Sequence, residues 1–292
     1  MTADIITSRE NKWLKIFRAG LRGTGPTGDE ALAVEGRKLV EDSLRSGLEA
    51  VALLVSESGE RELEHILRAA SESVAGIPRA RVLRTTDKLF ESVAGTEAPQ
   101  GVAALFRQPV WQFEDVLRGA TSADGAFHAG APLLVVLAAV QDPGNVGTMV
   151  RSAEAFGATG AVTTRGSADP WSPKAIRASA GSALRLPVLR GMAIPVLIAQ
   201  LRVAEVKIVA ASSRVTADGG ELAGVGADLR EAVAIFIGNE GAGLPPEVER
   251  AADARISIPI AESVESLNAG IAGAIVLYEA AKQRKITTDE HR

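Results

Sequence analysis

The chain has 292 residues, of which 46% are hydrophobic and 23% charged, with no cysteine, three histidines and a net charge of −4 at pH 7. This composition is that of a globular protein of about two domains, and it excludes disulfide scaffolds, cysteine nucleophiles and cysteine-type zinc sites. The polar N-terminus has no apolar signal region, and no uncharged apolar run approaches the roughly 18 residues that span a bilayer. We therefore expect a soluble, cytoplasmic protein without a metal site.

The first 106 residues alternate between helical and extended patterns, which predicts a small α/β unit. The expected elements are, in chain order, a helix over 8–19, a strand over 32–36, a helix over 37–46 that Gly47 ends, a strand over 51–56, a helix over 60–71 and a strand over 102–106. Residues 1–22 carry five basic and two acidic side chains. This local excess of positive charge fits either a nucleic-acid contact or an ordinary solvated face.

Residues 107–131 show little periodicity and many Gly, Ala and Ser residues, so we expect a linker between a unit of residues 1–106 and a unit of residues 132–292. In the second unit apolar strands alternate with helices, which is typical of a mostly parallel sheet covered on both faces. The expected strands lie at 133–140, 161–164, 206–211, 233–238 and 255–260, and the expected helices at 147–156, 172–180, 194–204, 245–251 and 264–284. Ligands of such sheets bind beyond the carboxyl ends of the strands.

Three loops that follow strands of the second unit carry the candidate chemistry. The first, 141–160, places Asn145 in a turn and Arg151 on the helix that follows. The second, 235–248, runs from a buried strand into a glycine-rich turn, and glycines let a backbone approach a ligand closely. The third, 256–280, ends a strand and starts a helix with capping residues and small side chains. Each loop alone fits a purely structural role, and none has the G-x-G-x-x-G fingerprint of a dinucleotide site.

Together the three loops resemble the three motifs of the SpoU, or TrmH-like, RNA ribose methyltransferases of the SPOUT class. The matches are N-x-G-x-x-x-R at Asn145, Gly147 and Arg151, G-N-E-G-x-G-L from Gly238 to Leu244, and I-P-x(6)-S-L-N at Ile258, Pro259, Ser266, Leu267 and Asn268. The resemblance covers about 133–284 in the family's order, including RASAGS at 177–182 between the first two motifs. Residues 34–47 resemble part of the RNA-binding α/β domain, related to ribosomal proteins, that many members carry.

The resemblance implies a fold that periodicity alone does not indicate. It implies an α/β protein in which a SPOUT catalytic domain, with a mostly parallel sheet and a deep trefoil knot, follows a smaller α/β RNA-binding domain that resembles a ribosomal protein. Knots are nearly absent from other proteins. In this family the C-terminal segment threads a loop, and the second and third motif loops build the cofactor pocket. Members are typically homodimers with their sites near the subunit interface.

By the same resemblance, the protein moves a methyl group from S-adenosylmethionine to a ribose 2′-hydroxyl of RNA, with no metal. The family assigns catalysis to Arg151, either as a base or as an anchor for phosphate and developing alkoxide charge, and the residue type leaves this choice open. The other catalytic candidates, which orient Arg151 and the ribose or shape the site, are Asn145, Glu240, Ser266 and Asn268. The candidate cofactor-binding residues, which act largely through backbone groups, are Ile237, Gly238, Asn239, Gly243, Ile258 and Leu267.

The RNA target has two candidate classes. The two-domain layout resembles the ribosomal RNA enzymes more than the short transfer RNA enzymes, which favours 23S ribosomal RNA over tRNA. A catalytically silent RNA-binding module of the same fold is a further alternative, against which the complete motifs argue. A nicotinamide-dependent enzyme on a Rossmann sheet is disfavoured because the early glycine fingerprint is missing.

Overall fold

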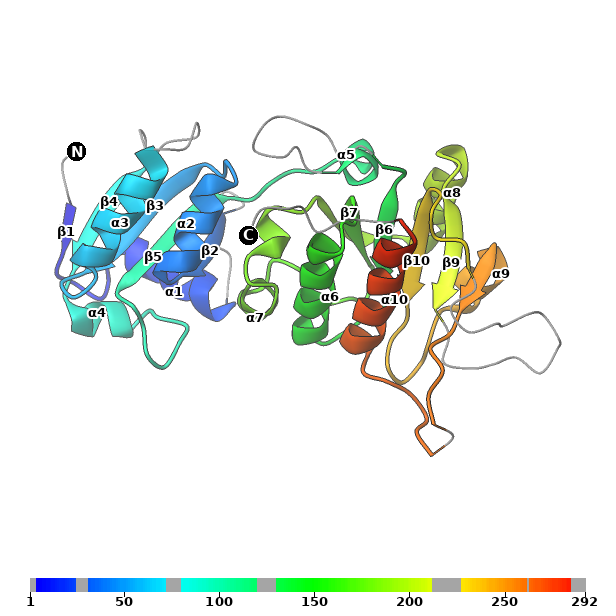
Figure 1. Ribbon diagram of the computed structural model, residues 1–292. Coiled ribbons are helices and arrows are strands. Elements are labelled where there is room, and N and C mark those ends of the chain that lie inside the picture. The colour runs from blue at the N-terminus through cyan, green and yellow to red at the C-terminus, as the bar shows by residue number, and fades with distance from the viewer. Residues whose placement is uncertain are drawn as a thin grey trace. The chain divides into compact units, whose positions relative to one another are not determined.

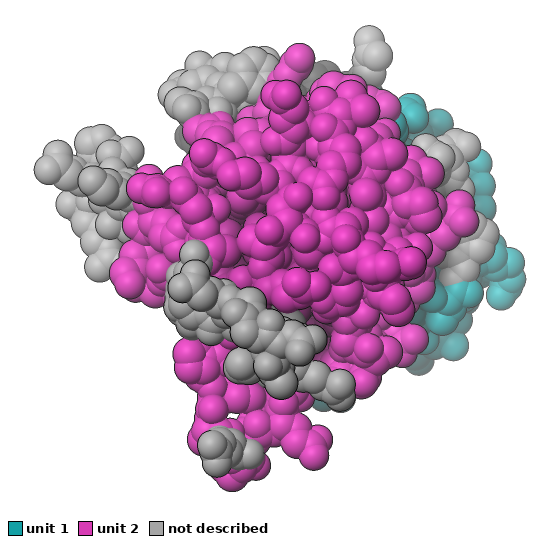
Figure 2. Space-filling view, turned by 90° about the vertical axis from the view of Figure 1, so that its right-hand side faces the viewer, with its two compact units in different colours: residues 1–110 teal, residues 111–292 magenta. Residues whose placement is uncertain are grey.

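The computed structural model describes residues 4–24, 31–71, 80–119, 130–211, 227–261 and 263–284. The chain divides into two compact units, Met1–Val110 and Trp111–Arg292, which Figure 2 shows in different colours. Each unit has a sheet and a hydrophobic core of its own. Within the described ranges, no helix is both long and apolar enough to cross a membrane.

The first unit is built on a five-stranded sheet of order β1-β4-β3-β5-β2. Its strands are β1 (Asp4–Ile6), β2 (Ala31–Glu35), β3 (Ala50–Ser56), β4 (Arg81–Thr85) and β5 (Val102–Arg107), and its helices are α1 (Lys12–Arg22), α2 (Arg37–Arg45), α3 (Glu60–Ser71) and α4 (Asp87–Glu91). β1, β4 and β3 pair in parallel, whereas β5 runs antiparallel to β3 and β2. Every predicted element of this unit is present, with shifted ends. β1, β4 and α4 are not predicted because five residues or fewer offer little periodicity.

The second unit contains a six-stranded sheet of order β11-β9-β10-β6-β7-β8 in which every pairing is parallel. The strands are β6 (Leu133–Leu137), β7 (Gly160–Thr164), β8 (Val188–Met192), β9 (Lys207–Ala211), β10 (Val233–Ile237) and β11 (Ala254–Ile256). The helices are α5 (Phe113–Arg118), α6 (Pro143–Ala155), α7 (Pro173–Ala178), α8 (Ile194–Val203), α9 (Pro246–Ala251), α10 (Ala269–Gln283) and the 3-10 turn η1 (Ser182–Leu184). The predicted parallel sheet is thus confirmed, whereas the trefoil knot stays a prediction.

Helices cover both faces of this second sheet, which is why β6 and β10 are buried along their whole length. On one face Leu134, Val136 and Phe236 form a core with residues of α5, α8 and α9. On the other face α10 packs against α6 and α6 against α7, and Figure 1 shows α6 and α10 side by side in front of the sheet. Alternate residues of each central strand therefore serve two separate layers.

Two helices of the second unit begin four or five residues away from their predicted starts. α6 begins at Pro143, four residues before its expected start, because the Asp142 side chain accepts the N–H of Asn145 at 3.1 Å and proline suits the first helical position. Asn145 therefore lies in the first turn of α6 and not in the turn that precedes it. α10 begins at Ala269, five residues after its expected start, with Asn268 as its cap.

Strand ends also differ from the prediction. β6 and β11 end early, at Leu137 and Ile256. After β6 the backbone of Ala139 adopts φ +57°, which turns the chain out of the sheet. β8 is not predicted, because Arg190 and Gly191 interrupt its apolar pattern. Such residues are tolerated there because β8 lies at the edge of the sheet.

The expected linker, 107–131, contains a helix that belongs to the second unit. Val116 of α5 is fully buried. A Cβ at Gly160 would lie 2.6 Å from the Val116 Cβ, so α5 sits directly on β7. Residues 120–129 of the expected linker lie outside the described residues. Because the apolar face of α5 is buried against the second sheet, the second unit begins at Trp111 and not after the expected linker.

Arg284 ties the C-terminal end of α10 to the sheet. Its guanidinium donates to the carbonyl oxygens of Leu229 at 2.6 Å and Pro132 at 3.1 Å, and also to those of Ala131 and Glu231. Burial lowers the pKa of Arg284 from its ordinary value. One cation therefore satisfies four carbonyl groups where the segments that lead into β6 and β10 meet the end of the helix.

We expect Arg284→Gln to lower the free energy of unfolding by about 2–3 kcal/mol, because several carbonyl oxygens lose a charged donor. Urea denaturation that follows the midpoint and the m-value measures this change. The matched control is Arg230→Gln, which removes an exposed ion pair with Asp228 at 2.9 Å and should change stability little. Equal midpoints for the two variants would contradict the prediction.

Candidate functional site

The three motif loops meet because α10 approaches α6 closely. A Cβ at Gly273 of α10 would lie 2.9 Å from Cγ and Sδ of Met149, and one at Gly270 would lie 3.3 Å from Oδ1 of Asn145. Glycine at these positions lets the two helices come together at their N-terminal ends. The motif glycine of the first loop acts in the same way on the other side of α6, since a Cβ at Gly147 would lie 2.4 Å from the Ala175 carbonyl oxygen of α7.

A directed chain of hydrogen bonds joins the three loops at this point. Asn268 caps α10 by accepting the N–H of Ile271 at 3.2 Å, and its Nδ2 donates to Oδ1 of Asn145 at 3.0 Å. Nδ2 of Asn145 donates in turn to Oε1 of Glu240. Each amide is used as donor and acceptor, so each orientation is determined. Three of the predicted catalytic residues are thereby brought into contact.

Asn239 shapes the glycine-rich loop from within. Its Oδ1 accepts the N–H groups of Gly241 at 2.9 Å and Ala242 at 3.1 Å, while its Nδ2 donates to the carbonyl oxygen of Ala139 at 3.2 Å. Its backbone pairs with that of Gly243, whose φ is +69°. A Cβ at Gly238 would lie 2.4 Å from the backbone of Gly243, so a side chain there would open the turn. The loop is consequently a closed turn joined to the end of β6.

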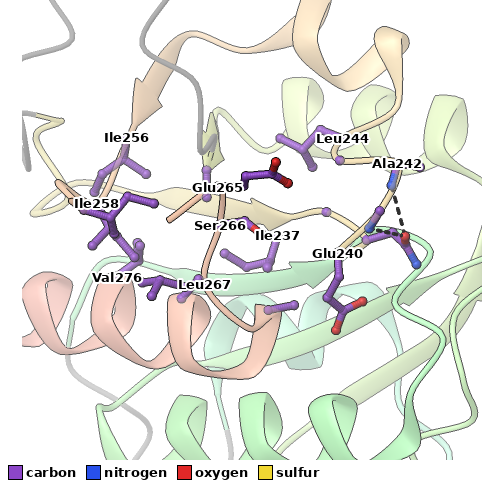
Figure 3. Close-up of a pocket in the computed structure, with 18 of the residues that line it drawn as sticks. Ile237, Glu240, Ala242, Leu244, Ile256, Ile258, Glu265, Ser266, Leu267 and Val276 are labelled. Carbon is purple, nitrogen blue, oxygen red and sulfur yellow. Dashed lines mark hydrogen bonds between the residues drawn. The ribbon is translucent and has the colours of Figure 1, made fainter. Parts of the chain in front are cut away.

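Beside this turn lies a cavity of about 710 Å³. All six predicted cofactor-binding residues line it, and so do the catalytic candidates Glu240 and Ser266. Figure 3 shows Ile256, Ile258, Val276 and Leu267 gathered at one end and Glu240 and Ala242 at the other. Apolar side chains and backbone groups thus form much of the wall, and acidic side chains add negative charge. The volume is that of a site for a nucleoside-sized ligand.

Arg151 stands apart from this arrangement. Its side chain is exposed on α6, does not line the cavity and makes no hydrogen bond or ion pair within the described ranges. Arg165 and Arg177 are likewise exposed and without a side-chain partner among the described residues. Other cations of residues 141–190, in which six basic side chains stand against three acidic ones, are engaged. Arg185 binds Glu154 at 2.6 Å, and Lys174 binds Asp142 at 2.5 Å.

Two residues that the sequence reasoning missed belong to the site. Asp142 caps α6 and pairs with Lys174, whose hydrogen bond is the main cause that lowers the pKa of the Asp142 carboxyl. The Asp-Pro pair before a helix is the signal that would have found this cap. Glu265, directly before the third motif's Ser266, lines the cavity. No three His, Cys, Asp or Glu side chains of the described chain gather in a group that could hold a metal.

Comparison with known proteins identifies the family. Residues 132–278 match the model of the SpoU rRNA Methylase family, and residues 27–104 match that of the MRM3-like substrate binding domain. An uncharacterized tRNA/rRNA methyltransferase of Mycobacterium marinum is 33% identical over 88% of this chain and 79% of its own. The 23S rRNA (guanosine(2553)-2′-O)-methyltransferase RlmP of Bacillus subtilis is 29% identical over 94% of this chain and 97% of its own.

Two solved structures extend the likeness to the whole fold. The AdoMet-bound rRNA methyltransferase from Sinorhizobium meliloti superposes with a TM-score of 0.77 at 29% identity, over 96% of this chain and 98% of that one. The SpoU methyltransferase AviRb from Streptomyces viridochromogenes, in complex with AdoMet, gives a TM-score of 0.77 at 26% identity, over 95% of this chain and 99% of that one.

The contact of α10 with α6 can be tested by a size series at Gly273. We expect Gly273→Ala to be nearly neutral, because Met149 is flexible and alanine favours a helix by about 1 kcal/mol. Gly273→Leu should destabilise the fold by about 1–3 kcal/mol through overpacking. Met149→Ala in the same chain should recover part of that loss, as measured by urea denaturation. Additive effects of the two substitutions would contradict direct contact.

The family model spans half of the chain, relatives one-third identical to it align along most of their length, and the three matching motifs meet at one cavity. The chain belongs to the SpoU rRNA methylase family.

Proposed function

We propose that this protein transfers a methyl group from S-adenosylmethionine to a ribose 2′-hydroxyl of large-subunit ribosomal RNA. The observation that carries the proposal is the hydrogen-bonded chain from Asn268 through Asn145 to Glu240 beside the cavity. This chain brings residues of all three motifs to the edge of the cavity, although Asn145 and Asn268 are 123 residues apart in the sequence. Ribosomal RNA is favoured over tRNA by the nearly full-length relative that acts on 23S rRNA. Such a substrate places the enzyme in the cytoplasm.

The cavity fits the chemistry of this cofactor. The side chains of Ile237, Ile258 and Leu267 offer apolar walls for a flat purine, and the backbone around Gly238 and Gly243 offers polar groups for its edge. The lining carboxylates complement a cofactor that carries a sulfonium and an ammonium group. When bound, the cofactor supplies a methyl group made electrophilic by the sulfonium. The chain's own task is then to align the ribose hydroxyl and to stabilise the charge it develops.

The polar chain positions Glu240 to accept a hydrogen bond from the ribose hydroxyl and so to orient it. Asn145 holds the Glu240 carboxylate from one side, and Asn268 in turn holds Asn145. Ser266 adds a hydroxyl to the cavity wall. These groups supply both acceptors and donors for a ribose, whose hydroxyls need both. Because hydrogen bonds hold Asn145, Asn268 and Glu240 to one another, these three side chains would need little rearrangement when the RNA arrives.

Arg151 supplies the positive charge that stabilises the developing alkoxide. Its side chain is exposed, which fits a site that a second copy of the chain completes. Ile271, Ile275 and Tyr278 form an exposed apolar stripe on α10, with exposed fractions of 53%, 39% and 55%. The Tyr278 ring meets Phe156, at the end of α6, at 5.7 Å between centroids. A second copy that covers this stripe makes the enzyme a homodimer and brings its surface beside α6. A guanidinium normally stays protonated, which favours the role of anchor for phosphate and alkoxide over that of base.

We expect Arg151→Ala to reduce methyl transfer at least about 100-fold, because the developing charge loses its cation. Cofactor affinity should persist, since Arg151 does not line the cavity. Methyl-labelled S-adenosylmethionine with unmodified ribosomal RNA or tRNA measures transfer, and resistance of one linkage to alkaline cleavage identifies ribose methylation. Arg230→Ala, an exposed arginine outside the site, is the control. Near-normal turnover of Arg151→Ala would contradict the assignment.

We expect Asn145→Asp to be slow at pH 8, because two carboxylates would then face each other and the donor to Glu240 would be removed. Contact between like charges raises the pKa of one carboxyl. The variant's rate relative to the parent should therefore rise as the pH falls toward about 6, where a shared proton restores the hydrogen bond. Asn145→Ala has no carboxyl group that could share a proton, so its rate relative to the parent should not change with pH. If the relative rate of Asn145→Asp were equally independent of pH, Asn145 would not position Glu240.

A further inference from the structure

The first unit holds an aromatic side chain with two cations near its ring. Trp13 lies on α1, where Nζ of Lys12 is 5.9 Å from the centroid of its ring. Cζ of Arg81, the first residue of β4, is also 5.9 Å from that centroid. We call these three residues the Trp13 patch. α1 lies outside residues 27–104, which match the substrate binding domain of known relatives.

Most other cations of α1 are engaged within the unit. Nε of Arg18 donates to the carbonyl oxygen of Ser92 at 3.4 Å. Arg22 donates to the carbonyl oxygens of Ser92 at 3.0 Å and Ala94 at 3.2 Å. Lys15 pairs with Glu10 at 2.6 Å. Arg18 and Arg22 hold the helix to the end of α4, so much of the positive charge of residues 1–22 serves the fold.

Lys12 differs from them. It is exposed, and within the described part of the chain it forms no hydrogen bond or ion pair through its side chain. Arg81 is also exposed. Lys12 is therefore a cation available to an anionic ligand beside the ring, in a chain whose net charge is −4.

The indole itself is held in place. Trp13 is half-buried against the core of the first unit, next to Ile6, Leu14 and their neighbours. Its backbone N–H donates to the side chain of Asn11 at 2.8 Å, which caps α1. The ring is therefore held against the core, while part of the Trp13 side chain stays exposed to solvent. A fixed aromatic surface with flanking cations is the combination that binds unpaired bases and their phosphates.

We propose that the Trp13 patch docks a single-stranded segment of the RNA substrate, with a base against Trp13 and phosphates on Lys12 and Arg81. This inference rests on the proposed function for the identity of the RNA. Stacking accepts any base, and phosphate contacts carry no sequence information. The patch therefore contributes affinity and orientation, while the choice of nucleotide lies elsewhere.

The test compares two double charge reversals in the full-length chain. Lys12→Glu with Arg81→Glu removes the cations of the patch. Lys88→Glu with Arg230→Glu changes the net charge equally at exposed sites outside it. We expect the patch variant to raise the KM for ribosomal RNA about ten-fold or more, with kcat at saturating RNA unchanged. The slope of log affinity against log salt should fall by about 2, one for each phosphate that the variant no longer binds. The control variant should keep both values.

A stacking readout separates base contact from charge alone. Single-stranded oligoadenylate should quench the tryptophan fluorescence of the parent protein. Trp13→Phe keeps a ring in the core and should lose that part of the quenching, although Trp111 and Trp171 remain. Duplex RNA of equal length should quench less, because its bases are not free to stack. Equal quenching of Trp13→Phe and parent would overturn the docking of a base.

The outcomes also separate this inference from the proposed function. If the parent methylates ribosomal RNA and the patch variant matches the control in KM and salt slope, the inference is wrong and the proposed function stands. If the parent binds RNA through the patch but transfers no methyl group, the inference stands and the proposed function fails. Patch-dependent binding of polyglutamate without binding of oligoadenylate would indicate an acidic protein partner and overturn the inference.

Discussion

The close contact between α6 and α10 is the constraint on which the rest of the site depends. Gly270 and Gly273 remove the side chains that would hold the helices apart. Their N-terminal ends then lie within hydrogen-bond distance, and Asn268 reaches Asn145. Larger residues would separate these ends, because packed cores leave no free volume to absorb them. The position of the proposed catalytic polar groups is therefore a consequence of small residues that carry no chemistry themselves.

α10 is fastened at both ends by polar side chains. Asn268 closes its start and connects it to the first motif, while Arg284 closes its end on four carbonyl groups. Between these points the helix has one apolar face on the sheet and α6, and another exposed through Ile271, Ile275 and Tyr278. The same helix can thus shape the cofactor cavity and offer the stripe that we propose as a subunit interface.

The distribution of cations shows why charge counted along a sequence is a poor guide to RNA contacts. In residues 1–22 and 141–190 several basic side chains serve the fold: Arg18 and Arg22 bind the end of α4, and Arg185 binds Glu154. The cations left over, such as Lys12 and Arg151, lie on separate units. Under our two proposals, the first unit holds the RNA through Lys12 and the second carries out the reaction with Arg151.

The sequence by itself determined the family, the parallel sheet and the residues that gather at the cavity, because motif spacing and strand periodicity are local properties of the chain. Only the tertiary structure decided that Asn145 holds Glu240 and is held by Asn268, since those partners are 95 and 123 residues away. It also decided that α6 starts at Pro143 and that a helix occupies the expected linker. These features arise from caps and from apolar faces buried between distant segments. Periodicity along the chain does not report such contacts, because it records which face of an element is apolar and not which element will cover it.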